Sequence, residues 1–365
     1  MFVKGGGPEG LGGGINLAWR IAVWQLIAVV VVAALVMGEP VVAVAGCLLL
    51  AVSAIRIDGK WLDQLVTTYL RYRSQRAHHD GTPLESLAPG LSTHAYTDRA
   101  GNRIGVAESG REWTALLRIE PPDTGSVGVL LDEVAASLSA AGEPGTKTEG
   151  VRLASAQLVR WAVPRPAKSQ AKTSSKTSSK TSGKRTWDVY WVAVRFDAVT
   201  DARAVAARGG GKKGAIAATA VAALRLAIQL RQAGFTARAV EEPELRTELV
   251  CSLGGPGKVR EAWRWWSVGT LHHATYRVNS STDPAQLLSW SAPAPALSTC
   301  TAILLRSKDR EVRRSVLTRI AVPADRKDRA AISSALRQAT SGSRRQLKPM
   351  NGRQRAGVRS TLPLG

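Results

Sequence analysis

The sequence predicts a two-helix N-terminal transmembrane hairpin followed by a cytoplasmic α/β domain, of the α+β kind with a mixed sheet. Three observations support this fold class. Two strongly apolar runs lie close together within residues 15–57, basic residues follow the second run, and strand-like and helix-like patterns alternate over most of the remaining chain. The chain has 365 residues, of which 44% are hydrophobic, so the part beyond the hairpin can form one large or two modest soluble domains.

The two apolar runs, residues 21–37 and 41–55, are separated by Gly-Glu-Pro at 38–40. A helix rises about 1.5 Å per residue and the hydrocarbon core of a bilayer is about 30 Å thick, so the first run can span it. The second run is short, but Arg56 and Lys60 can extend to the headgroups while the bilayer thins locally. Two membrane spans are therefore expected.

Two other interpretations of these runs remain open. One is a secretory signal peptide with Lys4 in its basic region, which the length of the run, Gln25 and the lack of a clean small-residue cleavage site disfavour. The other is a buried hairpin of a soluble protein, which is disfavoured because the runs have almost no polar face.

Basic residues predict the orientation in the membrane. The connecting turn carries only Glu39 as a charged residue, whereas these basic residues follow the second run: Arg56, Lys60, Arg71, Arg73 and Arg76. By the positive-inside rule, both termini and the large domain face the cytoplasm, and the chain is expected in the plasma (inner) membrane. Arg71, Arg73 and Arg76 are also expected to contact anionic lipids.

Two segments flank the hairpin. Residues 1–14 are rich in glycine and are expected to form a disordered lead. Residues 58–80 are expected to contain an amphipathic stalk helix, which continues the second span or lies at the membrane interface. Its apolar residues recur at spacings of three and four: Trp61, Leu62, Leu65, Tyr69 and Tyr72.

The cytoplasmic domain is expected in two parts, residues 81–163 and 186–345, followed by a C-terminal tail at 346–365. Between the two parts, residues 164–185 contain a repeat of Lys, Thr, Ser and Ser without an apolar side chain to bury. This loop is expected to be disordered, and a tolerated insertion is favoured over a site for acidic lipids.

Within this domain, residues 81–90 are expected to be a proline-punctuated loop. Strands are expected at 102–107, 112–119, 151–161, 186–196, 235–240, 260–267, 272–278, 300–306 and 312–320. Helices are expected at 127–140, 202–208, 215–231, 243–253, 284–290 and 326–339.

Two of these elements have distinctive patterns. Segment 186–196 is apolar on both faces, which predicts a central strand that is buried on both sides. Helix 215–231, with Gly234 as its cap, is apolar enough to be considered as a third span. Arg225 near its middle and its many alanines favour a core helix instead.

The net charge of +22 has four possible explanations. The chain could bind nucleic acid, anionic lipid or an acidic protein partner, or the charge could reflect a generally basic proteome. Nucleic acid is not expected as a partner, because the basic residues are spread along the chain and no recognition signature interleaves them with aromatic residues.

The glycine-rich segment at 209–214, with Lys212 and Lys213, invites comparison with a phosphate-binding loop. The Walker pattern requires a glycine five positions before Gly-Lys and a hydroxyl residue after it, and both are missing here. An anion at the following helix N-terminus is physically allowed, but a flexible turn is favoured.

Histidine and cysteine offer no legible site. The histidines are His78, His79, His94, His272 and His273. Adjacent pairs are poor chelates, and no metal, cofactor or catalytic residue is expected. Cys47 lies in the second run, while Cys251 and Cys300 are expected to be buried small hydrophobes. The tryptophans at 263, 265 and 266 are expected on both faces of a strand, and core or interdomain packing is favoured over a protein-docking surface.

The order of these features resembles the EccE family of type VII secretion systems in actinobacteria. The resemblance rests on the double apolar run, the helix after it, and the segments WDVYWVAVRFDA, ARGGGKKGAIAATAVAALRLAIQL, EAWRWWSVGTLHHATYRV and MNGRQRAGVRSTLPLG. The most specific parts are the Arg-Gly-Gly segment from Arg208 and the closing residues 351–365. The Lys/Ser/Thr loop departs from the family pattern.

The resemblance implies a non-enzymatic scaffold subunit of an inner-membrane core complex, with EccB, EccC, which carries the ATPase motor, and EccD as partners. Two other functions are kept open. One is a membrane-anchored transferase that holds an anionic or nucleotide-linked substrate near 209–214, and the other is a membrane-tethered nucleic-acid binder.

Overall fold

The computed structural model describes residues 9–57, 60–75, 81–140, 151–164, 186–278, 283–292, 296–308, 311–324 and 347–364. It divides into two units, one within Gly6–Ala77 and the other from His78 onward. The expected disordered loop at 164–185 and the expected helix at 326–339 lie outside the described residues, apart from Pro164, which ends a strand.

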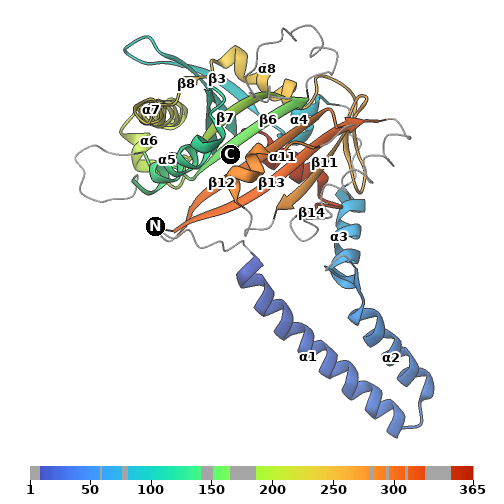
Figure 1. Cartoon of the computed structure of the whole chain (residues 1–365). Helices are drawn as coiled ribbons and strands as arrows, with labels where there is room; N and C mark the ends of the chain where they lie inside the picture. The colour runs from blue at the N-terminus through green and yellow to red at the C-terminus, as the bar shows by residue number, and fades with distance from the viewer. Residues whose placement is uncertain are drawn as a thin grey trace. The chain divides into compact units, whose positions relative to one another are not determined.

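The first unit begins with two helices, α1 (Glu9–Val36) and α2 (Pro40–Ala54), which form an antiparallel hairpin (Figure 1). Gly38 has a φ of 71° in the turn, a conformation that favours glycine, and Pro40 starts α2, where its missing N–H costs nothing. A Cβ at Gly46 would collide with Val31, so the two helices approach closely there. The structure differs from the expected lead at 1–14, because α1 already begins at Glu9.

A short antiparallel ladder follows α2 and joins β1 (Arg56–Ile57) to β2 (Lys60–Trp61). The helix expected within 58–80 is then present as α3 (Leu62–Gln75). Tyr72 is buried while Leu70 on the same helix is 57% exposed, which is the two-sided character that the apolar spacing predicted.

The second unit is built around one sheet of twelve strands, ordered β3-β4-β5-β7-β6-β12-β13-β11-β10-β9, with β8 paired to β5 and β14 to β11. The strands are β3 (Ser92–Thr97), β4 (Arg103–Ser109), β5 (Glu112–Ile119), β6 (Ser155–Pro164), β7 (Thr186–Asp197), β8 (Ala237–Ala239), β9 (Val259–Glu261), β10 (Trp266–Val268), β11 (Leu271–Val278), β12 (Ser298–Lys308), β13 (Glu311–Pro323) and β14 (Leu347–Pro349).

The prediction of a mixed sheet, with parallel as well as antiparallel strands, is wrong. Every described pair of strands is antiparallel. Short turns account for several of these pairs. Gly110 and Arg111 alone connect β4 to β5, and Gly269 and Thr270 alone connect β10 to β11. A two-residue connection can join only antiparallel neighbours, since a parallel pair needs a long crossover.

Helices cover both faces of the sheet (Figure 1). They are α4 (Pro83–Leu87), α5 (Val127–Ala140), α6 (Ala202–Ala206), α7 (Gly211–Gln232), α8 (Glu242–Ser252), α9 (Pro284–Ser289) and α11 (Gln354–Thr361). The main core lies between one face and helices α5, α6, α7 and α9. A second core lies between the other face and helices α4, α8 and α11.

Strand β7 takes part in both cores, which confirms the predicted central strand. Tyr190 and Val192 belong to the core under α7, whereas Trp191 and Ala193 belong to the core under α11. The strand pairs with β5 on one side and β6 on the other. Alternate side chains of one strand thus contribute to both apolar layers.

Helix α7 is, among the described residues, the one helix long and apolar enough to cross a membrane by composition, but it is mostly buried in this unit. Ala218, Ala223 and Leu226 are at most 1% exposed, because they pack on the sheet. The apolar parts of α1 and α2, Ile21–Val36 and Pro40–Ala51, are shorter.

Three local expectations differ from the structure. The loop expected at 81–90 contains α4, because Thr82 and Glu85 form a reciprocal capping box at its N-terminus. The strand expected at 260–267 is two strands, β9 and β10. The tail expected at 346–365 carries β14 and α11, with Val358 and Leu362 fully buried in the second core.

Candidate functional site

The outer surface of the α1 and α2 hairpin is strongly apolar. Large aliphatic side chains are exposed on both helices, including Leu26 at 66%, Leu35 at 63% and Leu48 at 60%. Small residues face inward, since Ala34 and Ala43 are buried. Such an arrangement is inside out for a soluble hairpin, because water would surround its largest apolar side chains.

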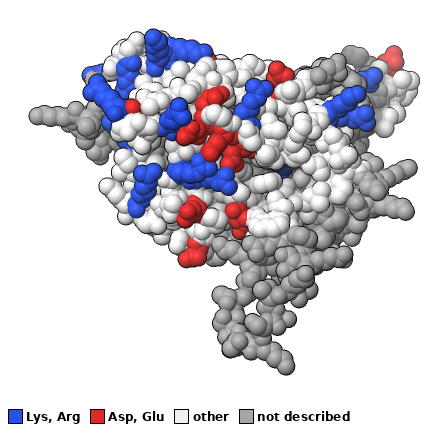
Figure 2. All heavy atoms as spheres, turned by 90° about the horizontal axis from the view of Figure 1, so that it is seen from above, with Lys and Arg blue, Asp and Glu red and all other residues white. Residues whose placement is uncertain are grey.

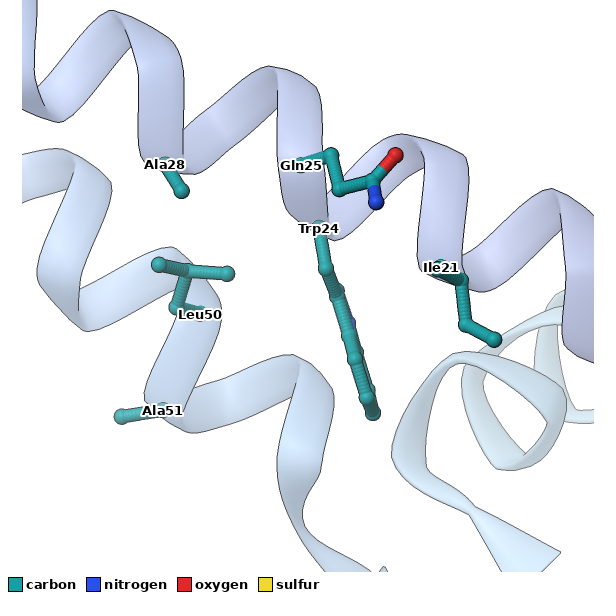
Figure 3. Close-up of a pocket in the computed structure, with 6 residues that line it drawn as sticks. All are labelled: Ile21, Trp24, Gln25, Ala28, Leu50 and Ala51. Carbon is teal, nitrogen blue, oxygen red and sulfur yellow. The ribbon is translucent and has the colours of Figure 1, made fainter.

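Figure 3 shows a hollow between these two helices, where Trp24 of α1 extends toward α2 and Ala28 lies near Leu50. The hollow has a volume of about 590 Å³ and is lined almost entirely by apolar atoms. Nothing in this lining offers a group for acid–base or nucleophilic chemistry, so it fits a lipid-like apolar environment rather than a polar substrate.

A polar cluster lies at the N-terminus of α7, where the glycine-rich segment was singled out in the sequence. Its centre is Glu108 of β4. The Oε2 atom of Glu108 accepts a hydrogen bond from Ser92 Oγ at 2.9 Å and lies 2.9 Å from His94 Nε2. Lys212 Nζ lies 2.7 Å from the same oxygen. Trp113 of β5 packs beside His94, and its ring centre is 6.0 Å from Lys212 Nζ.

The electrostatics of this cluster keep the carboxylate ionised. Burial alone would raise the pKa of Glu108, but hydrogen bonds from Lys212, His94 and Ser92 and the charge of Lys212 lower it to about 2. At neutral pH, Glu108 and Lys212 therefore form an ion pair that ties the first turn of α7 to β4.

This cluster does not have the geometry of a nucleophilic relay. In a Ser-His-acid triad, one histidine nitrogen contacts the serine and the other contacts the acid. Here His94 Nε2 is the atom near both Ser92 Oγ, at 3.1 Å, and Glu108 Oε2. Both contacts use one nitrogen, so the ring cannot pass a proton from Ser92 to Glu108.

The glycines of the segment 209–214 have structural reasons to be present. Gly209, Gly210 and Gly211 have φ values of 97°, 71° and 52°, which favour glycine. A Cβ at Gly214 would collide with the carbonyl oxygen of Val205. The segment connects α6 to α7 rather than a strand to a helix, and Lys212 forms an ion pair with Glu108. A phosphate-binding loop is therefore not supported.

The other histidines hold structural positions. His273 is buried, and its Nε2 lies 3.0 Å from the carbonyl oxygen of Leu253. Burial, followed by the positive charge of Arg319, lowers the pKa of His273 to about 3, so the ring is neutral at pH 7. His272 Nδ1 lies 2.6 Å from Ser267 Oγ. His78 and His79 lie outside the described residues.

The cysteines only partly match expectation. Cys300 is buried, and burial raises the pKa of its thiol, whereas Cys251 on α8 is exposed rather than buried. Its position on the solvent side of the helix was not visible from the sequence, since the apolar pattern of α8 is weak. Among the described residues, no group of three His, Cys, Asp or Glu side chains could hold a metal ion.

The three tryptophans were expected on one strand, but Trp263 lies in a hairpin turn between β9 and β10. The turn is closed by hydrogen bonds in both directions between Ala262 and Trp265. Trp266 is fully buried in the second core, and Trp265 packs on a smaller core around Ile320. These contacts support the core-packing interpretation for Trp265 and Trp266.

The basic residues expected to contact lipid are only partly described. Arg73 lies in the last turn of α3 and is exposed. Arg71 belongs to the same helix, and Arg76 lies outside the described residues. On the face of the second unit shown in Figure 2, Lys and Arg are interspersed with Asp and Glu rather than forming one continuous basic surface.

Sequence reasoning missed one polar cavity, of about 180 Å³, on the α11 side of the sheet. Arg195, Arg306 and Arg359 contribute to its lining, from β7, β12 and α11. These residues are far apart in the chain and share no motif. Their only sequence signal is that Arg195 and Arg306 interrupt apolar strands, where a charged residue is uncommon.

A comparison with models of protein families gives a match. Residues 181–278 match the family model described as "Putative type VII ESX secretion system translocon, EccE". The described part of this segment runs from β7 through α7 and α8 to β11, and so includes the central strand and the glycine-rich turn. No curated protein matches the chain.

Proposed function

We propose that this chain is a member of the EccE family, whose model matches residues 181–278, and that it is a non-enzymatic structural subunit of the inner-membrane core complex of a type VII secretion system. The observation that carries the proposal is the outward-facing apolar surface of α1 and α2, which would be costly to expose to water. A scaffold subunit requires such an anchor and does not require a catalytic relay.

In this proposal α1 and α2 both cross the membrane, with Gly38 and Glu39 on the outer side. Small inward-facing residues, including Gly46, allow the close helix packing that is typical of membrane hairpins. Basic residues after α2 hold both termini and the second unit in the cytoplasm. Arg71, Arg73 and Arg76 would then lie where anionic headgroups can contact them.

The proposed partners are the other membrane subunits of the system, EccB, EccD and the ATPase EccC. Two features support an assembly role for the second unit. It contains a wide, helix-covered sheet, and its polar cluster at Glu108 and Lys212 has a structural explanation. A broad rigid surface is what a neighbouring subunit would need for docking.

The test is purification of the tagged full-length chain from its own host in mild detergent, with native particle size and mass spectrometry of co-purifying proteins as readouts. We expect a large particle that contains an ATPase subunit and other membrane subunits of the secretion system. A small particle that contains this chain alone would contradict the proposal.

The same preparation separates this proposal from a membrane-anchored transferase. An enzyme that used the glycine-rich turn would bind labelled nucleotide, and binding would be lost in a Lys212→Ala, Lys213→Ala double variant. We expect no saturable nucleotide binding to the unaltered chain, because the ammonium group of Lys212 is paired with Glu108.

A further inference from the structure

Strand β3 forms one border of the sheet, and its outer side is open (Figure 1). Among the strands that the structure describes, it pairs with β4 alone. At the other end of the strand order, β9 has only three residues, and two of them are Arg260 and Glu261. Short length and charge are common protections of an edge strand against pairing with another chain. β3 has six residues and contains no Lys, Arg, Asp, Glu or Pro, so it lacks these protections.

The register shows which backbone groups of β3 face outward. Ala95 is opposite Gly105 of β4, and the N–H of Gly105 donates to the carbonyl oxygen of Val240 at 2.7 Å. Ala95 and Gly105 therefore form a non-hydrogen-bonded pair, in which each residue turns its N–H and C=O away from the other. Because the two kinds of pair alternate along an antiparallel ladder, Thr93 and Thr97 have the same orientation as Ala95.

The outer edge of β3 thus presents the N–H and C=O groups of Thr93, Ala95 and Thr97. None of these backbone groups has a hydrogen-bond partner in the described part of the chain. The side chains of Ala95 and Thr97 are exposed as well. An extended strand added at this edge would pair these groups and leave the ladder between β3 and β4 unchanged.

A second copy of β3 fits this edge in the antiparallel orientation. A twofold axis at Ala95 places this residue opposite its counterpart, and it places Thr93 opposite Thr97 of the second copy. All three residues then meet as partners through their outward N–H and C=O groups. Pairs of threonine across two strands are favourable, and the strands bring no acidic or basic residue opposite its own like charge.

Charged side chains next to the edge differ between its two ends. At one end, the carboxylate of Glu242 on α8 accepts a hydrogen bond from the Thr93 hydroxyl group and forms no ion pair with another described residue. At the other end, Arg103 of β4 is opposite Thr97, so it projects from the same face. Its guanidinium group lies 3.9 Å from Glu241, and its side chain remains 71% exposed.

The turn between β3 and β4 adds two more charges to the Arg103 end. The carboxylate of Asp98 accepts hydrogen bonds from backbone and side-chain amide groups within the turn. Arg99 is exposed and has no ion-pair partner among the residues that the structure describes. The twofold pairing brings Arg99 and Arg103 of one copy to the end where the second copy carries Glu242. Such charge complementarity favours a second copy as the occupant of this edge.

We propose that β3 is an interface between two copies of this chain, which pair antiparallel about Ala95 and join their sheets into one. The inference goes beyond the proposed scaffold role, because it names a second copy as a partner and does not depend on the secretion system. A strand of another protein is the alternative occupant, and the tests separate the two.

Cross-linking tests the register in the full-length chain in mild detergent. All variants also carry Cys47→Ser and Cys251→Ser, because both cysteines are exposed. The Cα atoms of a hydrogen-bonded antiparallel pair are about 5.5 Å apart, within the range of a disulfide bond. We expect Ala95→Cys to form disulfide-linked dimers under mild oxidation. Thr97→Cys is the matched control, because four residues of ladder, or roughly 13 Å, would separate its two copies.

The protein mass in detergent, measured by light scattering over a range of concentrations, tests the strength of the interface. We expect a dimer of the unaltered chain and of Ala95→Ser. Ala95→Pro should weaken the dimer by about tenfold or more, because it removes the two hydrogen bonds at the twofold axis. The N–H of Ala95 does not pair with β4, so the fold should survive, and the melting temperature checks this.

A second pair of variants does not rely on proline. Ala95→Lys and Ala95→Glu each place like charges at the axis and should be monomeric alone, whereas a mixture of the two should form dimers. A monomeric unaltered chain, equal cross-linking at positions 95 and 97, or a dimer of unchanged strength in Ala95→Pro and Ala95→Lys would overturn the proposal.

Cross-linking of Ala95→Cys to a different protein would also overturn it, because a strand of that protein would then occupy the edge. The outcome is distinct from that of the co-purification experiment. A monomer that still co-purifies with the ATPase subunit would refute this interface and leave the proposed function intact.

Discussion

Lys212 of α7 and Glu108 of β4 form an ion pair with a separation of 2.7 Å, although 104 positions separate them in the sequence. The pair gives the lysine at position 212 of the glycine-rich segment a structural role. It places the positive end of that side chain over Trp113 and against a carboxylate, which fixes the start of α7 on the sheet.

The first prediction concerns the loss of this ion pair's stabilising effect at acidic pH. Because the folded-state pKa of Glu108 is about 2, below its ordinary value of 4.5, the carboxylate stabilises the fold above pH 4.5. This contribution is lost as the pH falls from 4.5 toward 2. In Glu108→Gln, we expect a free energy of unfolding lower by about 1 kcal/mol at pH 7, since Lys212 is partly exposed.

The measurement is the melting temperature of the unaltered chain and of Glu108→Gln at several values between pH 7 and pH 3. Tryptophan fluorescence reports unfolding. The difference between them should shrink as the pH falls through the window from 4.5 toward 2. A difference that stays constant across this range would contradict the assigned ion pair. Glu244→Gln, which removes a half-exposed partner of Arg238, serves as the control.

The second prediction concerns His273, which is neutral in the folded state because its pKa is lowered from 6.5 to about 3. The unfolded chain binds one more proton between these values, so stability rises with pH in this window, by up to about 1.4 kcal/mol per pH unit. His273→Gln keeps a donor near the carbonyl oxygen of Leu253 and should flatten this part of the profile. A profile that stays as steep in His273→Gln as in the unaltered chain would contradict the assignment to this ring.

The third prediction tests whether α7 is a core helix. Leu226 is 1% exposed and packs in the main core, whereas Ile228 on the same helix is 52% exposed. Leu226→Ala should lower the free energy of unfolding by about 2–5 kcal/mol, and Ile228→Ala by less than about 1 kcal/mol. Thermal melting of the two variants provides the comparison. Similar losses would indicate that α7 is not packed as described.

The fourth prediction concerns membrane topology. If α1 and α2 cross the membrane as proposed, the cysteine of a Glu39→Cys, Cys47→Ser double variant should react with a membrane-impermeant maleimide in intact cells. Cys251 is exposed on α8 and should react only after lysis, so it provides an internal control in the same chain. Labelling of Cys251 in intact cells, or protection of position 39, would show that the orientation is wrong.

Several elements could be predicted from the sequence because local spacing defines them. The bounds of α5 were predicted without error, since apolar residues recur at helical spacing up to a glycine. Strand β7 was predicted to be central because both of its faces are apolar. The β9 and β10 hairpin was missed, because its tryptophans have high strand propensity even where the chain turns.

The candidate sites were less predictable. The sequence drew attention to Lys212 but gave no indication of its partner, because Glu108 lies on a strand whose neighbours are set by the whole sheet. The arginine cavity was missed altogether. Arg195 and Arg306 share a face only through the register of β7, β6 and β12, and α11 adds Arg359 from the end of the chain.

Side-chain spacing within single segments was enough to predict the apolar hairpin, the core character of α7 and the two-sided burial of β7. Three features became visible only in the folded chain: the sheet is antiparallel, residues 347–364 complete its second core, and three distant arginines line one cavity. These features depend on strand pairing and helix docking between remote segments, and many pairings satisfy the same local pattern.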